Sequence, residues 1–208
     1  MTEIVIPLLA AILAIVLHEV AHGYAALALG DDTAKNAGRL TLNPIAHVDR
    51  VGTLIVPGIL LILQSIFGGH FMFGWAKPVP VAAWKFRDPR RGMMIVAAAG
   101  PAMNFVLAYA TALALHLELG ELFETFAFSF ILFNLLLGLF NLLPIPPLDG
   151  GHAALLLAGA RRERAVRKVA IGVAALVVLW GVATQNIFVV LLVGLMGYRN
   201  YQVLQEQR

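Results

Sequence analysis

The sequence contains no cysteine, few charged residues and no long polar stretch. Without cysteine, disulfides and thiolate metal sites are excluded, so any metal site must use histidine, carboxylate or backbone ligands. Charged residues make up only 13% of the chain and hydrophobic residues 60%, against about 25% and about 45–50% in soluble domains. The composition therefore predicts one membrane-embedded domain over residues 1–208, with no appended soluble domain.

Five apolar segments approach or reach the roughly 17–25 residues that a membrane-spanning helix needs. They are residues 4–29, 93–117, 125–143, 168–184 and 186–200. The first has no basic region before it, so we interpret it as a retained helix rather than a signal peptide. The last two are so close in sequence that a tight helical hairpin would fit them. We expect an all-α polytopic membrane protein with about five spanning helices.

The loop charges predict how these helices are oriented. Loops 30–50, 74–92 and 159–168 are basic, whereas loop 118–124 contains three glutamates and no lysine or arginine. All three basic loops face the cytoplasm only if the apolar run 51–67 does not cross the membrane, and this arrangement satisfies the positive-inside rule. We therefore expect residues 51–73 to be re-entrant or interfacial. The net charge of +3 is explained by these loops, so no nucleic-acid partner is expected.

The strongest chemical signal is His18-Glu19-Val20-Ala21-His22. On a helix, residues i and i+4 share a face, so His18 and His22 can bind one metal ion. Glu19 lies beside that face, where it can take a proton from water at the metal, which is the mechanical basis of the H-E-x-x-H motif. A chance match in a core helix is the alternative, but ionisable groups within an apolar helix are costly and usually functional.

A catalytic zinc ion usually has three protein ligands, so a third ligand must come from elsewhere. The remaining histidines are His47, His70, His116 and His152. The best carboxylate is Asp149, which follows three prolines and precedes two glycines in the run 141–151. Taken alone, this run fits an ordinary turn equally well. The predicted topology favours Asp149, because His18 and His22 lie about 21–27 Å along a helix that begins outside, and segment 125–143 also begins outside.

The sequence resembles the site-2 proteases, a family of intramembrane zinc metalloproteases. The resemblance rests on His18 to His22, on the run from Asn141 to Gly151 with its Leu148-Asp149-Gly150 core, and on Gly100-Pro101-Ala102-Met103-Asn104. It covers roughly residues 4–152. It implies Zn²⁺ bound by His18, His22 and Asp149, with Glu19 as general base and Asn141 stabilising the oxyanion. The chain would be a minimal form without a PDZ or CBS domain.

The segment Gly38-Arg39-Leu40-Thr41-Leu42-Asn43 alternates like a short strand. In the family, a strand near the active site can pair with an unwound substrate, so we expect a short β-hairpin there that binds substrate. An ordinary surface hairpin is the alternative. The substrate would be a transmembrane protein cleaved in or near its membrane segment, and the oligomeric state is unknown from sequence.

We expect a multi-pass protein of a prokaryotic cell membrane, with the active site near the cytoplasmic side. A membrane transporter or metal-binding protein is one competing hypothesis, but several of the predicted helices offer few polar groups. A catalytically idle scaffold is another, and the intact Glu19 argues against it.

Overall fold

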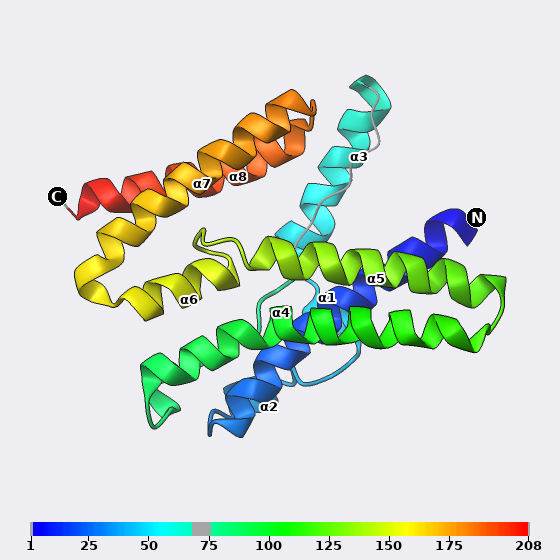
Figure 1. The fold of residues 1–208 in the computed structure, drawn as a ribbon, viewed down its shortest axis with the longest axis horizontal. Coiled ribbons are helices and arrows are strands. Elements are labelled where there is room, and N and C mark those ends of the chain that lie inside the picture. The colour runs from blue at the N-terminus through cyan, green and yellow to red at the C-terminus, as the bar shows by residue number, and fades with distance from the viewer. Residues whose placement is uncertain (1, 68–75, 208) are drawn as a thin grey trace.

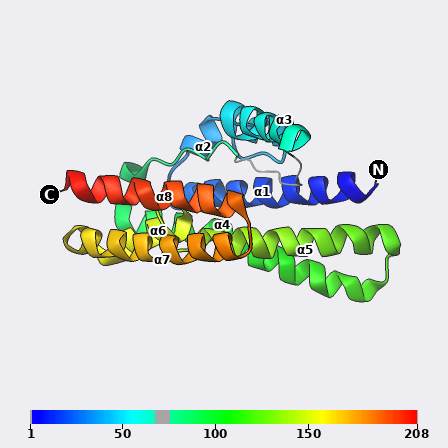
Figure 2. The same cartoon turned by 90° about the horizontal axis from the view of Figure 1, so that it is seen from above.

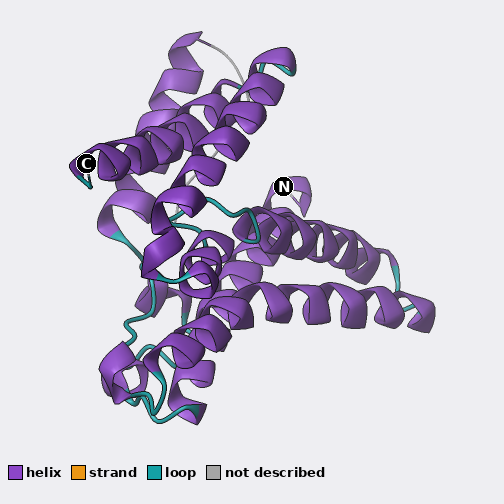
Figure 3. Cartoon of the chain, turned by 60° about the vertical axis from the view of Figure 1, so that its left-hand side comes forward, coloured by secondary structure: helices purple, strands orange, loops and turns teal. Residues whose placement is uncertain are grey.

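The computed structural model describes residues 2–67 and 76–207, and every regular element in this part of the chain is helical (Figure 3). The longer elements are α1 (Thr2–Ala28), α2 (Thr33–Asn36), α3 (Val56–Phe67), α4 (Pro89–Ala114), α5 (Glu121–Asn141), α6 (Asp149–Ala158), α7 (Glu163–Ala183) and α8 (Ile187–Glu206). Short 3-10 or π-helical turns are η1 (Pro44–His47), η2 (Arg50–Ile55), η3 (Ala83–Lys85), η4 (Leu115–Leu117) and η5 (Ala160–Arg162). The all-α expectation is confirmed.

Four helices in the described part of the chain are long and apolar enough to cross a membrane. They are Glu3–Ala28, Pro89–Leu117, Glu121–Asn141 and Ala160–Ala183. The chain is therefore a multi-pass membrane protein, and four of the five expected segments meet these requirements among the described residues. The fifth expected segment, 186–200, does form a helix, α8, of 20 residues. Its C-terminal half carries the polar residues Arg199, Asn200 and Glu206.

The apolar run 51–67 forms the π-helical turn η2 followed by α3. Asp49 begins this turn, because its carboxylate accepts hydrogen bonds from the amides of Val51 and Gly52. Helix α3 contacts η2 and stands apart from the paired helices in Figure 1. Residues 68–73 lie outside the described residues, so the re-entrant path of 51–73 remains a prediction.

Helices α1, α4 and α5 pack against one another and form the body that carries the histidine motif. Figures 1 and 2 show α4 and α5 side by side and antiparallel. Ala10 and Ala14 of α1 are fully buried against Phe130 of α5. Small residues at such contacts let two helix backbones approach closely in a membrane. Large side chains such as Val106 and Leu132 point outwards and are more than half exposed, as expected for a lipid-facing surface.

Helices α7 and α8 form the predicted tight hairpin, which is separated from α4 and α5 in Figure 1. The side chain of Asn186 accepts a hydrogen bond from the amide of Val189 and so begins α8, and only three residues separate the two helices. A buried cluster of Ile145, Leu148, Ala170, Ala174 and Val193 joins this hairpin to the loop that precedes α6. The hairpin is therefore connected directly to the segment that ends at Asp149.

Candidate metal centre

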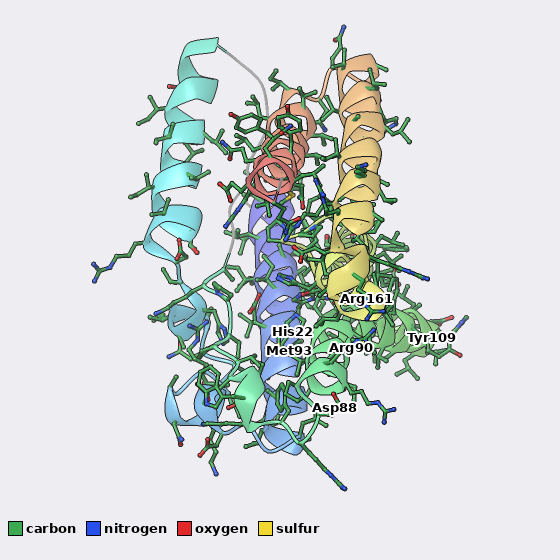
Figure 4. The ribbon with its side chains drawn as sticks, turned by 90° about the vertical axis from the view of Figure 1, so that its left-hand side faces the viewer. His22, Asp88, Arg90, Met93, Tyr109 and Arg161 are labelled. Carbon is green, nitrogen blue, oxygen red and sulfur yellow. The ribbon has the colours of Figure 1, made fainter. Side chains whose placement is uncertain are left out.

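A cavity of about 540 Å³ lies between α1, α4, α5, α6 and α8. His18, Glu19 and His22 of α1 line it together with Asn141 of α5 and Asp149 of α6. His22 is labelled in Figure 4 beside Met93, another residue of the cavity wall. The structure therefore brings all five residues that the two motifs predicted into one cavity.

Three ligand atoms converge at the centre of this cavity. The Nε2 atoms of His18 and His22 lie 3.1 Å apart, and Oδ2 of Asp149 lies 3.3 Å from the first and 3.4 Å from the second. A tetrahedral ion with ligands at roughly 2.0–2.1 Å has its ligand atoms about 3.3 Å apart. The spacing of the three atoms therefore fits a tetrahedral zinc ion with one further coordination position.

The protonation of the two imidazoles also fits a cation. Nδ1 of His22 donates to the carbonyl of Val96 at 2.6 Å, so the proton of the neutral ring is on Nδ1 and Nε2 carries a lone pair. Oδ2 of Asp149 is buried and makes no hydrogen bond with any described residue. Unpaired lone pairs held this close in a buried site are unfavourable unless a cation lies between them.

A chain of buried amides fixes the tautomer of His18. Nδ2 of Asn134 donates to the carbonyl of Phe130 at 2.8 Å, and a carbonyl can only accept. Oδ1 of Asn134 therefore accepts from Nδ2 of Asn104 at 2.8 Å, and Oδ1 of Asn104 accepts from Nδ1 of His18 at 2.6 Å. Both asparagines are fully buried. The chain crosses α1, α4 and α5 and leaves Nε2 of His18 free to bind a metal ion.

Gly100 of α4 allows the two imidazoles to pack against the helix backbone. A Cβ atom at this position would lie 2.6 Å from Cε1 of both His18 and His22 and would also clash with Nε2 of His22. Gly100 and Asn104 belong to the third motif that carried the family resemblance. The motif therefore has a physical basis here, because its glycine makes room for the ligands and its asparagine orients one of them.

Asp149 is the first residue of α6 and is held by close backbone packing. A Cβ atom at Gly150 would lie 2.8 Å from the carbonyl oxygen of Leu143, and one at Gly151 would lie 2.6 Å from Cδ of Pro146. A carboxylate binds a metal ion as the anion. Oδ2 of Asp149 faces Nε2 of both imidazoles, where a cation would balance its charge.

Residues 76–82, here called the strap, run along one wall of the cavity without regular secondary structure. Lys77 and Val79 each precede a proline, which favours an extended backbone. The amide of Val79 donates to Oε2 of Glu19 at 3.0 Å. One oxygen of Glu19 is therefore held by the strap. This bond orients the carboxylate and does not involve His18, His22 or Asp149.

Asn141 is the last residue of α5 and lines the cavity. Its Nδ2 atom donates to the carbonyl of Leu137 at 3.0 Å. An amide nitrogen has two protons, so this bond leaves one donor available. Among the other histidines, His152 also lines the cavity, His47 and His116 do not, and His70 lies outside the described residues.

The predicted β-hairpin at residues 38–43 is wrong, because the structure has no strand among residues 2–67 and 76–207. Gly38 adopts a φ of 65°, and the amide of Arg39 bonds back to the carbonyl of Ala34, as at the end of a helix. Asn43 then begins η1 by accepting a hydrogen bond from the amide of Ile45. These local bonds replace a strand ladder, and the alternation at 38–43 is too short to outweigh them.

None of the six residues 38–43 lines the metal cavity. Leu40 instead packs against Gly23, one residue beyond His22, where it fills the space a side chain at Gly23 would need. Arg39 is buried and donates through Nη2 to the carbonyl of Lys77. The segment therefore supports α1 and the strap from outside the cavity.

Sequence reasoning gave Asn104 no role although it lies in the third motif, and it missed the buried Asn134 and Asn200 and the bond between Glu19 and the strap. An asparagine within an apolar helix is costly unless it has partners, which is a signal that could have selected all three. No comparable signal exists for the strap, because the contact between Val79 and Glu19 joins residues that are far apart in sequence.

Comparison with known proteins adds a separate observation. The sequence profile of peptidase family M50 matches residues 117–183, which include Asn141 and Asp149. YwhC of Bacillus subtilis (strain 168), named as a candidate zinc metalloprotease, is 43% identical over 149 residues, which are 67% of this chain and 63% of the relative. Rip2 of Mycobacterium tuberculosis (strain Erdman and strain H37Rv), named in the same way, is 34% identical over 142 residues.

The Rip2 match covers 67% of this chain and 51% of the relative, so the chain spans between about half and two thirds of the curated relatives it matches. No solved structure matches the chain significantly. The resemblance stated from the sequence motifs is confirmed, and these relatives point to Zn²⁺ as the cofactor. The chain belongs to peptidase family M50, the site-2 protease family of zinc metalloproteases.

Proposed function

We propose that this protein is an intramembrane zinc metalloprotease that hydrolyses peptide bonds in or near the transmembrane segments of other membrane proteins. One observation carries the proposal. Three ligand atoms, from His18, His22 and Asp149, converge within 3.4 Å of one another in a cavity between apolar helices, and Glu19 lines the same cavity. The membrane-embedded domain, residues 1–208, would contain the complete catalytic site.

The residues around the metal centre have separate roles in this proposal. When bound, zinc supplies a Lewis acid that polarises the peptide carbonyl and lowers the pKa of water towards about 7. Glu19 accepts a proton from the attacking water and passes it to the leaving amine. The amide of Val79 holds one oxygen of Glu19, so the other oxygen remains available for the proton. Because Glu19 is beside the ligand face of α1, it can do this without binding the metal.

Asn141 has the chemistry needed to stabilise the tetrahedral oxyanion. It lines the same cavity, and only one of its two amide protons is used, in the bond to Leu137. A donor that is already in place when negative charge develops lowers the barrier more than one that must reorient. We infer that the second proton of Asn141 points to the oxyanion when a substrate is bound.

The substrate class follows from the walls of the cavity. Apolar side chains such as Ile15, Phe140 and Leu192 line it beside the metal ligands, so it suits an apolar peptide segment. An intact substrate helix shields its carbonyls through its own hydrogen bonds. The segment must therefore unwind, at least locally, before a peptide bond can reach Glu19.

Replacement of Glu19 by glutamine tests the mechanism. Glutamine keeps the size and the acceptor for the Val79 amide but cannot take a proton. We expect the purified E19Q protein to bind zinc as wild type does and to lose proteolysis of a helical membrane substrate by about 10²–10⁴-fold, the usual contribution of a general base. Glu3→Gln, at an exposed position of the same helix, is the matched control and should retain full activity.

Two results would contradict this mechanism. Wild-type cleavage by E19Q would mean that Glu19 is not the base. Loss of zinc from E19Q would mean that Glu19 is a ligand, and the role of Asp149 would then need to be reassigned. A zinc-loaded wild-type protein that cleaves no membrane substrate would favour the idle scaffold or the metal-binding protein considered above.

We further propose that the metal centre lies near the cytoplasmic side of a prokaryotic membrane, because the basic loops then face the cytoplasm. Since the chain has no cysteine, single cysteines can be introduced at Lys35, Arg87 and Glu118, all of which are exposed. A membrane-impermeant thiol reagent should label positions 35 and 87 from the cytoplasm and position 118 from outside. Labelling of positions 35 and 87 from opposite sides would show that 51–67 crosses the membrane.

A further inference from the structure

Asn200 of α8 contacts the loop that leads to Asp149. Its side chain is 1% exposed, and its Nδ2 atom donates to the carbonyl of Pro146 at 2.6 Å. The same nitrogen donates to the carbonyl of Met196, one turn earlier in α8, at 2.9 Å. Both protons of the amide are therefore used, one on its own helix and one on the loop. Asn200 lies 54 positions from Pro146 and outside every motif considered above.

The other end of this amide is also fixed. Oδ1 of Asn200 accepts from Nη1 of Arg167 at 3.1 Å, and Arg167 in turn forms an ion pair with Glu163 at 2.7 Å. Nε2 of Gln207 donates to the same carboxylate at 2.9 Å. Arg167 can only donate, so Oδ1 of Asn200 faces α7 and Nδ2 faces the loop. The orientation of the amide is therefore set by α7.

The loop between α5 and α6 is held by two short turns and by packing, and Asn200 adds a hydrogen bond from a side chain of α8. It contains Pro144, Pro146 and Pro147, which have no amide proton to donate. The side chains of Ile145 and Leu148 are buried in the cluster with α7 and α8. Pro146 precedes Asp149 by three residues, a distance of at most about 10 Å along the chain. A shift of Pro146 is therefore transmitted directly to Asp149.

We propose that Asn200 is a positioning residue for the metal centre, holding the carbonyl of Pro146 so that Asp149 lies within bonding distance of the ion. The inference rests on the proposed zinc site and adds to it. The histidine ligands are placed by α1. The loop that carries the third ligand is held to the α7–α8 hairpin by the buried side chains of Ile145 and Leu148 and by the hydrogen bond from Asn200. Residues that orient ligands from outside the coordination sphere affect metal affinity by about 10–100-fold when they are replaced.

Asn200→Asp tests the inference most directly. Aspartate keeps an oxygen for Arg167 but has no amide protons for Pro146 or Met196. We expect the purified full-length variant to bind zinc about 10–100-fold more weakly than wild type in competition with a chelator. Thermal unfolding of the metal-free protein is measured on the same samples, because the carbonyls of Pro146 and Met196 lose their donor and some loss of stability is expected as well. Gln207→Leu is the control, since it breaks a hydrogen bond of the same network without touching Asn200.

A second variant and a second background make the test independent of folding. Asn200→Leu has the same branching and number of side-chain heavy atoms, cannot bond to Pro146, and should show the same loss of zinc affinity if the aspartate variant does not fold. In an Asp149→Asn background, where the third ligand is already impaired, Asn200→Asp should lower the remaining zinc affinity by less than twofold. A residue that only stabilises the fold would lower it equally in both backgrounds.

The two proposals fail in different ways. If wild type binds zinc and the Asn200 variants bind it equally well, Asn200 is not a positioning residue and the proposed function is unaffected. If Asn200→Asp weakens zinc binding as much in the Asp149→Asn background as in wild type, the effect does not act through Asp149 and the inference is overturned. If wild type binds no zinc, the proposed function fails and this inference fails with it.

Discussion

The metal centre has two sides that are built differently. His18 and His22 lie within α1, a helix of 27 residues, and are held by bonds to Asn104 and Val96 of α4. Asp149 begins α6, a helix of 10 residues, after a proline-rich loop. On the helix side, the spacing of the two histidines is set by the backbone hydrogen bonds of α1, which join residues close in sequence. The loop side depends on packing against α7 and α8, which are distant in sequence from the histidines.

The two sides should therefore respond differently to substitutions elsewhere in the chain. A pair of histidines at i and i+4 keeps its spacing wherever the helix is stable. Asp149 keeps its place only while the loop contacts persist. We therefore expect the helix side to set whether zinc binds at all, and the loop side to set how tightly it binds.

His22→Ala should have the largest effect, because it breaks the pair on the helix side. Two remaining ligands fall short of the three that catalytic zinc uses, so stoichiometric zinc should be lost. Proteolysis should fall by more than the roughly 10²–10⁴-fold expected for loss of the general base. Zinc content by elemental analysis, with a protease assay on the same sample, gives both values. The comparison would be reversed if His22→Ala kept more zinc than Asp149→Ala.

Asn104→Leu should have a smaller effect, because it leaves all three ligands in place. The substitution keeps the branching of the side chain but removes the acceptor for Nδ1 of His18, so the imidazole loses its fixed tautomer. Zinc affinity should fall about 10–100-fold, measured by chelator competition. Asn134→Leu, which acts on His18 only through Asn104, should have a weaker effect. An equal effect of both variants would mean that they act on the packing of α4 and α5 rather than on the tautomer.

The parts of this structure that could be predicted from sequence depend on local patterns. The spacing of His18 and His22 places both on one face of a helix, and the loop charges brought Asp149 to the same depth. The hydrophobic runs predicted α1, α4, α5 and the α7–α8 hairpin. Each of these follows from hydrophobicity or charge within a short stretch of sequence.

The parts that could not be predicted depend on contacts between distant residues. Asn104 and His18 are 86 positions apart, and Val79 and Glu19 are 60 positions apart. Such pairs follow from how helices pack, and no local pattern encodes them. The β-hairpin expectation failed for a related reason. A strand needs a partner, and the alternation at 38–43 says nothing about whether one is present.

The contact of Gly100 with both imidazoles has a consequence for the evolution of related proteins. Any larger residue at this position would occupy the space of the two imidazoles, although His18 and His22 themselves would be unchanged in sequence. A descendant could therefore keep His-Glu-x-x-His and Leu-Asp-Gly intact and still lose its metal ion. We expect some inactive relatives to differ at this glycine while keeping both metal-binding motifs. Such a natural variant should contain no zinc when it is purified.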